Sequence, residues 1–191
     1  MKQVIQNYRS GHLELAEVPV PMCTSDTILV KNATSLVSIG TERSIIELGK
    51  KSLLGKAKAR PDLVKRFLDK AKKEGYIKTF QEALGRLDNA TPLGYSSSGV
   101  VVEVGTNIHK IAPGDRVACI GAGYASHAGY ITVPENLCCK MPDKMEFEEA
   151  SFAMLGIIAL HGIRCSKLTF GSSVAVIGLG LLGMLTVQML K

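Results

Sequence analysis

The sequence lacks tryptophan and contains no run of about 18 consecutive apolar residues, the length that a membrane-spanning helix needs. Its polar start, MKQVIQNYRS, also lacks the apolar core of a signal peptide. These absences argue against a transmembrane segment and against secretion, so we expect a cytoplasmic protein. A hydrophobic content of 46%, an aromatic content of 5% and 19 glycines are typical of a folded, turn-rich chain, which excludes extended disorder.

The sequence also lacks any Cys-x-x-Cys pair. Its five cysteines are odd in number and scattered, and its four histidines stand far apart. This pattern favours reduced thiols and does not fit the spacing of a zinc cluster. The residues concerned are Cys23, Cys119, Cys138, Cys139, Cys165, His12, His109, His127 and His161. We expect no metal site among them.

The formal net charge of +6 is concentrated in one segment. Residues 44–91 carry twelve Lys and Arg against six Asp and Glu, whereas the rest of the chain carries eleven of each sign. An otherwise neutral protein therefore contains one basic insert. The insert has only two Phe and one Tyr and no recognised nucleic-acid motif, so nucleic-acid binding is not expected.

The insert also has its own helical pattern. Apolar residues recur at helical spacing after Pro61, a residue suited to a first helical turn, and Gly75 is placed to end that helix. Thr79 and Glu82 have the spacing of a capping box and predict a second helix. We therefore expect a basic helical pair.

The rest of the chain up to residue 150 is organised as short strands. Apolar residues alternate or cluster in short runs separated by glycine or proline, in residues 4–5, 13–18, 28–36, 98–105, 116–120 and 130–133. Many short strands predict a barrel, so residues 1–150 are expected to form one mostly β domain that includes the basic insert. After Pro142, acidic residues precede the apolar segment 150–164, which predicts a buried helix linking two domains.

A glycine motif follows near the end of the sequence. The motif Gly178-Leu179-Gly180-Leu181-Leu182-Gly183 lies between an expected β run at 173–177 and an expected helix at 184–190. In this context Gly178 permits a tight turn, Gly180 lets the backbone approach a pyrophosphate, and Gly183 lets helix and strand pack closely. The six residues are therefore candidate dinucleotide ligands; the alternative is a tight βα turn of any α/β protein.

The motif leaves the choice of cofactor open. An acidic residue that binds the ribose hydroxyls is expected about 20 residues further on, beyond Lys191, so NAD and NADP are both possible cofactors. One βα unit cannot form a parallel sheet by itself. We therefore expect residues 151–191 to be a linking helix and the start of a truncated Rossmann domain, and the chain alone to bind cofactor weakly and to be inactive.

Six further motifs accompany the glycine motif. They are Leu15-Ala16-Glu17-Val18-Pro19, Ile28-Leu29-Val30-Lys31, Gly40-Thr41-Glu42, GYSSSGVVVEVG at 94–105, Gly114-Asp115-Arg116-Val117 and Ala159-Leu160-His161. Their order resembles the medium-chain dehydrogenase/reductase superfamily, whose members join an N-terminal GroES-like barrel to a Rossmann domain. The resemblance covers nearly the whole chain and implies an NAD(P)-dependent oxidoreductase.

The resemblance also identifies where zinc-dependent relatives carry their metal ligands. At those positions this sequence has Ile39, Tyr95, Ser96 and the pair Met154-Leu155, and the four-cysteine structural lobe is missing. None of these side chains supplies a thiolate, imidazole or carboxylate, which implies a zinc-free member. The sequence of residues 38–44 and the basic insert most resemble a bacterial subgroup in which a second oxidoreductase module of the Gfo/Idh/MocA type follows. Members of this subgroup are often associated with surface-polysaccharide biosynthesis.

The resemblance assigns roles to three side chains. Thr41 would lie near the nicotinamide, where it would pass a proton or orient the ribose; the alternative is a turn threonine. Tyr95 would donate a hydrogen bond to a substrate oxygen; the alternative is core packing. Arg43 would face the pyrophosphate, although a surface arginine or one paired with Glu42 is favoured. His161 is expected to be an interior histidine and not catalytic.

The sequence thus predicts hydride transfer between a nicotinamide and a carbonyl, alcohol or activated alkene, without zinc. The partner is a small-molecule substrate, and the basic insert favours an anionic one such as a nucleotide-activated sugar or a lipid-linked diphosphate. We expect the full-length protein to be a homo-oligomer. The alternative is a noncatalytic binding or assembly module whose barrel and basic insert recognise an acidic partner.

Overall fold

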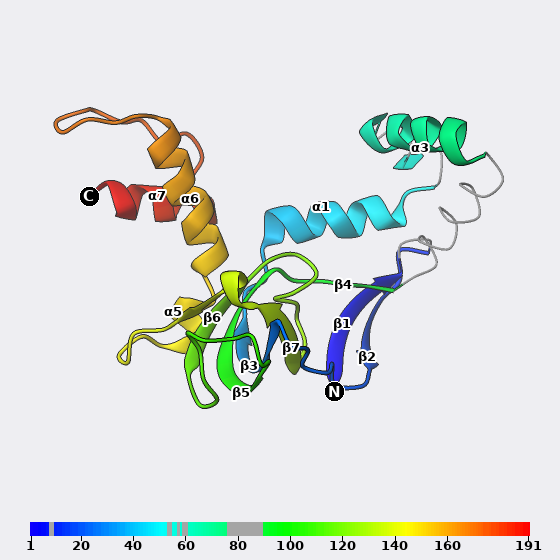
Figure 1. The fold of residues 1–191 in the computed structure, drawn as a ribbon. Helices are drawn as coiled ribbons and strands as arrows, with labels where there is room; N and C mark the ends of the chain where they lie inside the picture. The colour runs from blue at the N-terminus through cyan, green and yellow to red at the C-terminus, as the bar shows by residue number, and fades with distance from the viewer. Residues whose placement is uncertain (8–9, 53–54, 57, 59–60, 76–89) are drawn as a thin grey trace. The chain divides into compact units, whose positions relative to one another are not determined.

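The computed structural model describes the 191-residue chain except residues 8–9, 53–54, 57, 59–60 and 76–89 (Figure 1). The chain forms two compact units. The first unit contains Met1–Val18 and Val37–Leu93, and the second contains Pro19–Leu36 and Gly94–Lys191. The units are therefore interleaved along the sequence, while the division into domains 1–150 and 151–191 stays a prediction.

The first unit contains a three-stranded antiparallel sheet in the order β2-β1-β4. The strands are β1 (Lys2–Asn7), β2 (Leu13–Glu17) and β4 (Ala90–Pro92). The first two confirm the strands expected at 4–5 and 13–18. The third was not predicted, because a three-residue strand that ends in proline has too little pattern to be recognised.

Helices also belong to the first unit. Helix α3 (Pro61–Glu74) confirms the helix expected after Pro61. It ends immediately before Gly75, whose N–H donates to the Ala71 carbonyl at 3.0 Å. The second helix expected from Thr79 lies outside the described residues. The basic insert therefore contains the first of the two expected helices.

Helix α1 (Ile39–Lys50) contains Thr41, which therefore lies in a helix and not in a turn. The helix begins after Ser38, whose backbone N–H donates to Glu42 Oε1 at 2.8 Å. Glu42 is buried in the first turn. A carboxylate there satisfies a backbone donor and interacts favourably with the positive end of the helix dipole.

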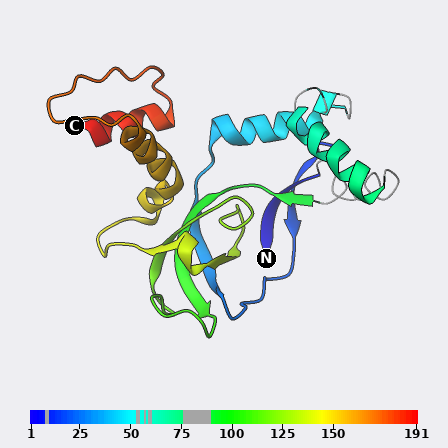
Figure 2. The same cartoon turned by 45° about the horizontal axis from the view of Figure 1, so that its top comes forward.

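The second unit contains a five-stranded antiparallel sheet in the order β7-β3-β5-β6-β8, which curls strongly in both views (Figures 1 and 2). Its strands are β3 (Thr27–Ser35), β5 (Ser96–Val104), β6 (Arg116–Ile120), β7 (Tyr130–Pro134) and β8 (Cys138–Lys140). Ile28, Val30, Val117 and Val133 are fully buried in its core. The mostly β prediction with added helices is thus confirmed, and four of these strands match predicted runs.

Helical segments also belong to the second unit, and the first of them lies between β7 and β8. They are the 3-10 turn η1 (Glu135–Leu137), α5 (Phe147–Ala150), α6 (Ala153–Cys165) and α7 (Leu181–Leu190). Helix α5 has a capping box in which Glu146 and Glu149 each bond the other's backbone N–H. No helix in the described part of the chain is both long and apolar enough to cross a bilayer.

Helix α6 confirms the helix expected at 150–164, but the expected burial of this segment is wrong. Leu155 and Ala159 are buried, whereas Ile157, Ile158 and Leu160 are exposed. The helix packs mainly on α7, β5 and β6 among the described elements, and these cover only one side of it. His161 is also exposed, with Nε2 3.5 Å from Cys165 Sγ, so the expectation of an interior histidine is wrong.

The strand expected at 173–177 is also wrong. These residues pair with no strand of the described chain, and Ile177 is 99% exposed. A strand exists only through hydrogen bonds to a neighbour, so an apolar β run without a partner remains an extended loop. The helix expected at 184–190 is confirmed as part of α7.

Candidate functional site

The candidate site of the second unit begins at the turn that leads into β5. Gly94 has a φ of +95°, and a Cβ at this position would lie 2.7 Å from the backbone nitrogen of His127. The next residue, Tyr95, is held in place by its carbonyl, which accepts a hydrogen bond from Gly121 N–H at 2.9 Å. A glycine at 94 therefore lets the Tyr95 and His127 segments lie against each other.

The hydroxyl of Tyr95 is the most informative atom of this site. Tyr95 is 9% exposed, and its Oη has no hydrogen-bond partner among the described residues. Burying a hydroxyl without a partner is unfavourable, and such atoms are uncommon in folded proteins. A bound oxygen-containing ligand would satisfy this donor.

Three consecutive serines follow Tyr95, and two of them have structural partners. Ser96 Oγ donates to the Ser151 carbonyl at 2.6 Å and accepts from Met154 N–H at 3.2 Å. Ser98 Oγ donates to the carbonyl of Phe147 at 2.6 Å. These bonds tie the start of β5 to α5 and α6 and use both Ser96 and Ser98 for positioning.

A histidine that sequence reasoning did not assign to the site lies beside Gly94. His127 is 9% exposed, and its Nδ1 lies 2.8 Å from Ser35 Oγ. Asn32 Nδ2 donates to the carbonyls of Ser126 and Ala128, at 3.2 and 2.8 Å, and so fixes the backbone on both sides of this histidine. No local motif in the sequence indicates the pairing, because the histidine and its serine partner are 92 residues apart.

The remaining predicted side chains belong to the first unit. Thr41 lies exposed in the first turn of α1, in a different unit from Tyr95. Arg43 Nε lies 2.7 Å from Glu47 Oε1, one helical turn further along α1. This hydrogen bond and the carboxylate charge raise the pKa of Arg43, and the guanidinium lowers the pKa of Glu47. The favoured surface role of Arg43 agrees with this contact, and its role at a pyrophosphate stays a prediction.

The glycine motif forms a tight turn that leads into α7. Gly178 has a φ of +93°, and a Cβ on Gly183 would collide with the Gly178 carbonyl oxygen, so turn and helix are in direct contact. Gly180 is the N-cap of α7, and a Cβ there would meet open space. The N-terminal N–H groups of α7, which begins at Leu181 and Leu182, are thus available to an anion, and Leu179 lies exposed in the turn.

The described residues contain no group of three or more His, Cys, Asp or Glu side chains that could hold a metal ion. At the positions where zinc-dependent relatives carry ligands, Tyr95 is buried and Ser96 is hydrogen bonded to the backbone. Neither side chain is a usual zinc ligand.

Comparisons with known proteins agree with this architecture. Residues 74–143 match the family model of the alcohol dehydrogenase GroES-like domain. The chain is 30% identical to (R,R)-butanediol dehydrogenase of Bacillus subtilis over 122 residues, which cover 52% of this chain and 35% of that protein. Sorbitol dehydrogenase of Bombyx mori is 26% identical over 132 residues, 55% of this chain and 38% of that protein.

A solved structure shares the fold. Galactitol-1-phosphate dehydrogenase from Escherichia coli superposes with a TM-score of 0.71 at 21% identity, over 99% of this chain and 52% of that one. The chain therefore spans a little over a third of these two sequence relatives and about half of this structural relative. It has a GroES-like fold and homologues among the alcohol and polyol dehydrogenases.

Proposed function

We propose that this chain, whose residues 74–143 match the alcohol dehydrogenase GroES-like domain, forms the N-terminal part of a zinc-independent NAD(P)-dependent oxidoreductase. The reaction is hydride transfer to or from a carbonyl, alcohol or activated alkene. The observation that carries the proposal is the buried Tyr95 hydroxyl, which has no partner in the described chain. A relative that is 30% identical is named for a diol substrate, which supports an alcohol or carbonyl as the reacting group.

The glycine motif is the proposed cofactor site. The backbone N–H groups at the start of α7 would hold the pyrophosphate, and Gly180 leaves room for its close approach. When bound, the nicotinamide supplies or accepts the hydride. The residues that contact the adenosine half of the cofactor decide between NAD and NADP, and the proposed site can take either cofactor.

Tyr95 is the proposed substrate-binding donor. A neutral phenol donates a hydrogen bond to the substrate oxygen, on which negative charge develops when a carbonyl accepts hydride. Because the hydroxyl is already desolvated, its interaction with that charge is stronger than it would be in water. The same hydrogen bond stabilises the transition state of the reverse reaction, in which an alcohol loses a proton and a hydride.

Thr41 is proposed to orient the nicotinamide ribose or to pass a proton. Its hydroxyl is exposed on the first turn of α1, so it is accessible to a ligand. The neighbouring Arg43 would have to leave Glu47 to reach a phosphate. Thr41 is therefore the stronger candidate of the two.

The basic insert is proposed to favour an anionic substrate. Lys65, Lys72 and Lys73 are exposed on α3, where their charges remain solvated and act at a distance. Such a face raises the encounter rate with an anion, an effect that salt weakens. A sugar linked to a phosphate or diphosphate meets this requirement, and a role in polysaccharide biosynthesis would follow.

The test uses a polypeptide that carries this chain together with a complete cofactor domain. It is assayed with NADH and NADPH, and with their oxidised forms, against alcohols, aldehydes and activated alkenes. Tyr95→Phe should lower kcat by about 100-fold with a smaller change in KM. Tyr130→Phe, in half-buried β7, is the matched control and should keep activity.

Metal content is measured on the same preparation. Activity should survive chelation, and elemental analysis should find no stoichiometric zinc. A tightly held zinc, or full activity in Tyr95→Phe, would contradict the proposal. Binding of an acidic partner without turnover of any substrate would favour a noncatalytic module.

A further inference from the structure

Two cysteines face each other across neighbouring strands of the second unit. Cys119 on β6 and Cys138 on β8 are direct partners in the antiparallel register. Their Sγ atoms lie 3.8 Å apart. Directly opposed residues of antiparallel strands have Cα atoms about 4.5 to 5.5 Å apart, within the range that a disulfide spans. Side-chain rotation can therefore join the two sulfurs while the strands stay paired.

The two thiols differ in access. Cys119 is fully buried in the core, whereas Cys138 is partly exposed. An open hollow of about 490 Å³ lies beside Cys138. It is lined by Lys110, Ile111, Glu135, Asn136, Cys138, Cys139 and Lys140. A small thiol compound can therefore approach the pair from the side of Cys138.

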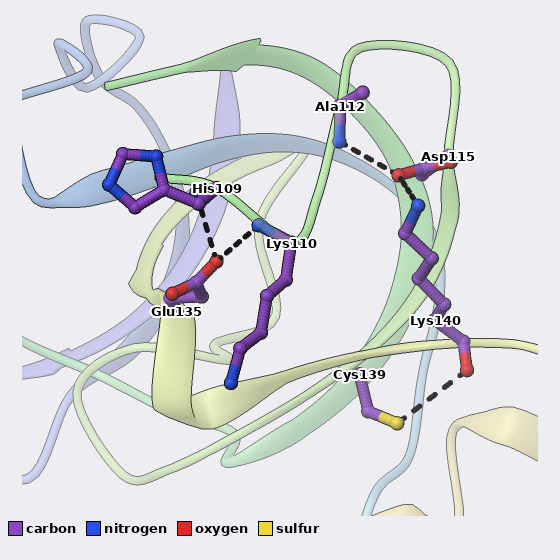
Figure 3. A network of polar contacts seen from close by, with 7 residues as sticks. All are labelled: His109, Lys110, Ala112, Asp115, Glu135, Cys139 and Lys140. Atoms are coloured by element: carbon purple, nitrogen blue, oxygen red, sulfur yellow. Dashed lines mark hydrogen bonds and ion pairs between the residues drawn. The ribbon is translucent and has the colours of Figure 1, made fainter. Parts of the chain in front are cut away.

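Polar contacts hold Lys110, Glu135 and Lys140, three of the residues that line this hollow (Figure 3). Glu135 Oε1 accepts from the backbone N–H groups of His109 and Lys110 at 3.2 and 2.8 Å. Lys140 Nζ lies 2.7 Å from Asp115 Oδ2. Charges of both signs thus surround the opening, which suits a small peptide that carries carboxylates and an ammonium group.

The order of reaction follows from the environment of the buried thiol. The hydrogen bond with Cys138 and the burial of the side chain raise the pKa of Cys119. Cys119 therefore stays protonated while the pair is intact, and the thiolate is the nucleophile in disulfide exchange. Attack on an external disulfide must begin at Cys138.

We propose that Cys138 is a thiol-disulfide exchange site and that Cys119 is its resolving thiol, with a low-molecular-weight disulfide as oxidant. The Cys138 thiolate attacks one sulfur of the oxidant, forms a mixed disulfide and releases the first small thiolate. Cys119 then attacks Cys138 Sγ, displaces the second small thiolate and passes its proton to that departing thiolate. Two protein thiols are oxidised by two electrons, and one small disulfide is reduced to two thiols.

Cys139 is the natural control for this proposal. Successive residues of a strand point to opposite faces, so Cys139 does not share the orientation of its neighbour. It is exposed, and its Sγ lies 3.5 Å from the carbonyl of Lys140, its own neighbour in the chain (Figure 3). Cys139 can form a mixed disulfide with the oxidant, but the geometry gives it no resolving partner.

The experiment exposes the purified chain to oxidised glutathione, blocks free thiols by alkylation in acid, and cleaves after Arg116, Glu135 and Lys140. Cleavage separates Cys119, in fragment 117–135, from the other two cysteines, in fragment 136–140. Mass spectrometry should find the two fragments joined, with the loss of two hydrogen atoms. Dithiothreitol should separate them again.

The variants decide which cysteines are joined. Cys139→Ser should form the link to the same extent as the wild type. Cys138→Ser and Cys119→Ala should lower the linked fraction by at least about tenfold and retain only glutathione adducts. Absence of the link in the wild type, or a link that survives in Cys138→Ser, would overturn the proposal. The test needs no oxidoreductase activity and is independent of the proposed function.

Discussion

The substitution Tyr95→Phe should stabilise the second unit while it lowers activity. The Tyr95 hydroxyl is buried without a partner among the described residues, which costs about 1 to 3 kcal/mol of folding free energy. Removing the oxygen loses a few dispersion contacts of about 0.1 to 0.2 kcal/mol each. The net expectation is a gain of about 1 kcal/mol, or a rise in Tm of about 2 to 4 °C for a chain of 191 residues.

Neighbouring serines provide matched comparisons for this prediction. Ser97 Oγ is also buried without a described partner, so Ser97→Ala should likewise raise the free energy of unfolding, by about 1 kcal/mol. Ser96→Ala should cost about 2 kcal/mol or more, because it leaves the Ser151 carbonyl and the Met154 N–H without their partner.

Urea unfolding followed by circular dichroism measures all three variants. A loss of about 1 kcal/mol or more in Tyr95→Phe would mean that the hydroxyl has a structural partner. In that case the phenol is part of the core and not a substrate donor. A stability gain combined with lost turnover is the signature of a residue retained for function.

Further predictions concern stability, the cofactor turn and the insert. Hydrogen bonding to Cys138 and burial raise the pKa of Cys119 in the folded chain. Above about pH 8.5 the thiol therefore ionises in the unfolded chain but not in the folded one. The contribution of Cys119 to the free energy of unfolding is complete below that pH and declines above it by about 1.4 kcal/mol per pH unit. Urea midpoints should therefore fall more steeply above that pH in the wild type than in Cys119→Ala, and equal slopes would contradict this reasoning. Gly183→Ala should speed amide exchange in α7 by about tenfold, because its Cβ collides with the Gly178 carbonyl, whereas Gly180→Ala, which meets open space, should not. In the protein with a complete cofactor domain, changing Lys65, Lys72 and Lys73 to Gln should lower kcat/KM for an anionic substrate by about tenfold at low salt. The decrease should be smaller at high salt, which screens the charges. An unchanged kcat/KM at low salt would mean that these lysines form only a solvated surface.

The strands were predictable where side chains alternate between core and solvent. Residues 116–120 and 130–133 match β6 and β7 because one face of each strand lies in the core. Helix α1 was not predictable in this way. Its first turn contains Gly40 and Thr41, which are weak helix formers, and Glu42 stabilises it through a contact with the residue before the helix.

The candidate site was predictable only in part. The glycine turn is local, so its order of residues predicted both the tight turn at Gly178 and the close packing of Gly183. The buried, unpartnered state of Tyr95 depends on the surrounding core, and the His127–Ser35 contact joins residues distant in sequence. Apolar periodicity could not reveal that the 173–177 run pairs with no strand among the described residues, because pairing depends on the neighbouring strand as well as on the run itself.

The interleaving of the two units has a consequence for synthesis on the ribosome. Strand β1 pairs with β4, which is made about 85 residues later, so the first sheet remains two-stranded until the intervening chain has been translated. At about 5 to 20 residues per second this interval is on the order of 10 seconds. The open edge of β1 is exposed to other nascent chains throughout this time, and such edges pair readily with foreign strands. Slow codons between the two strands would lengthen that exposure and lower the yield of folded protein.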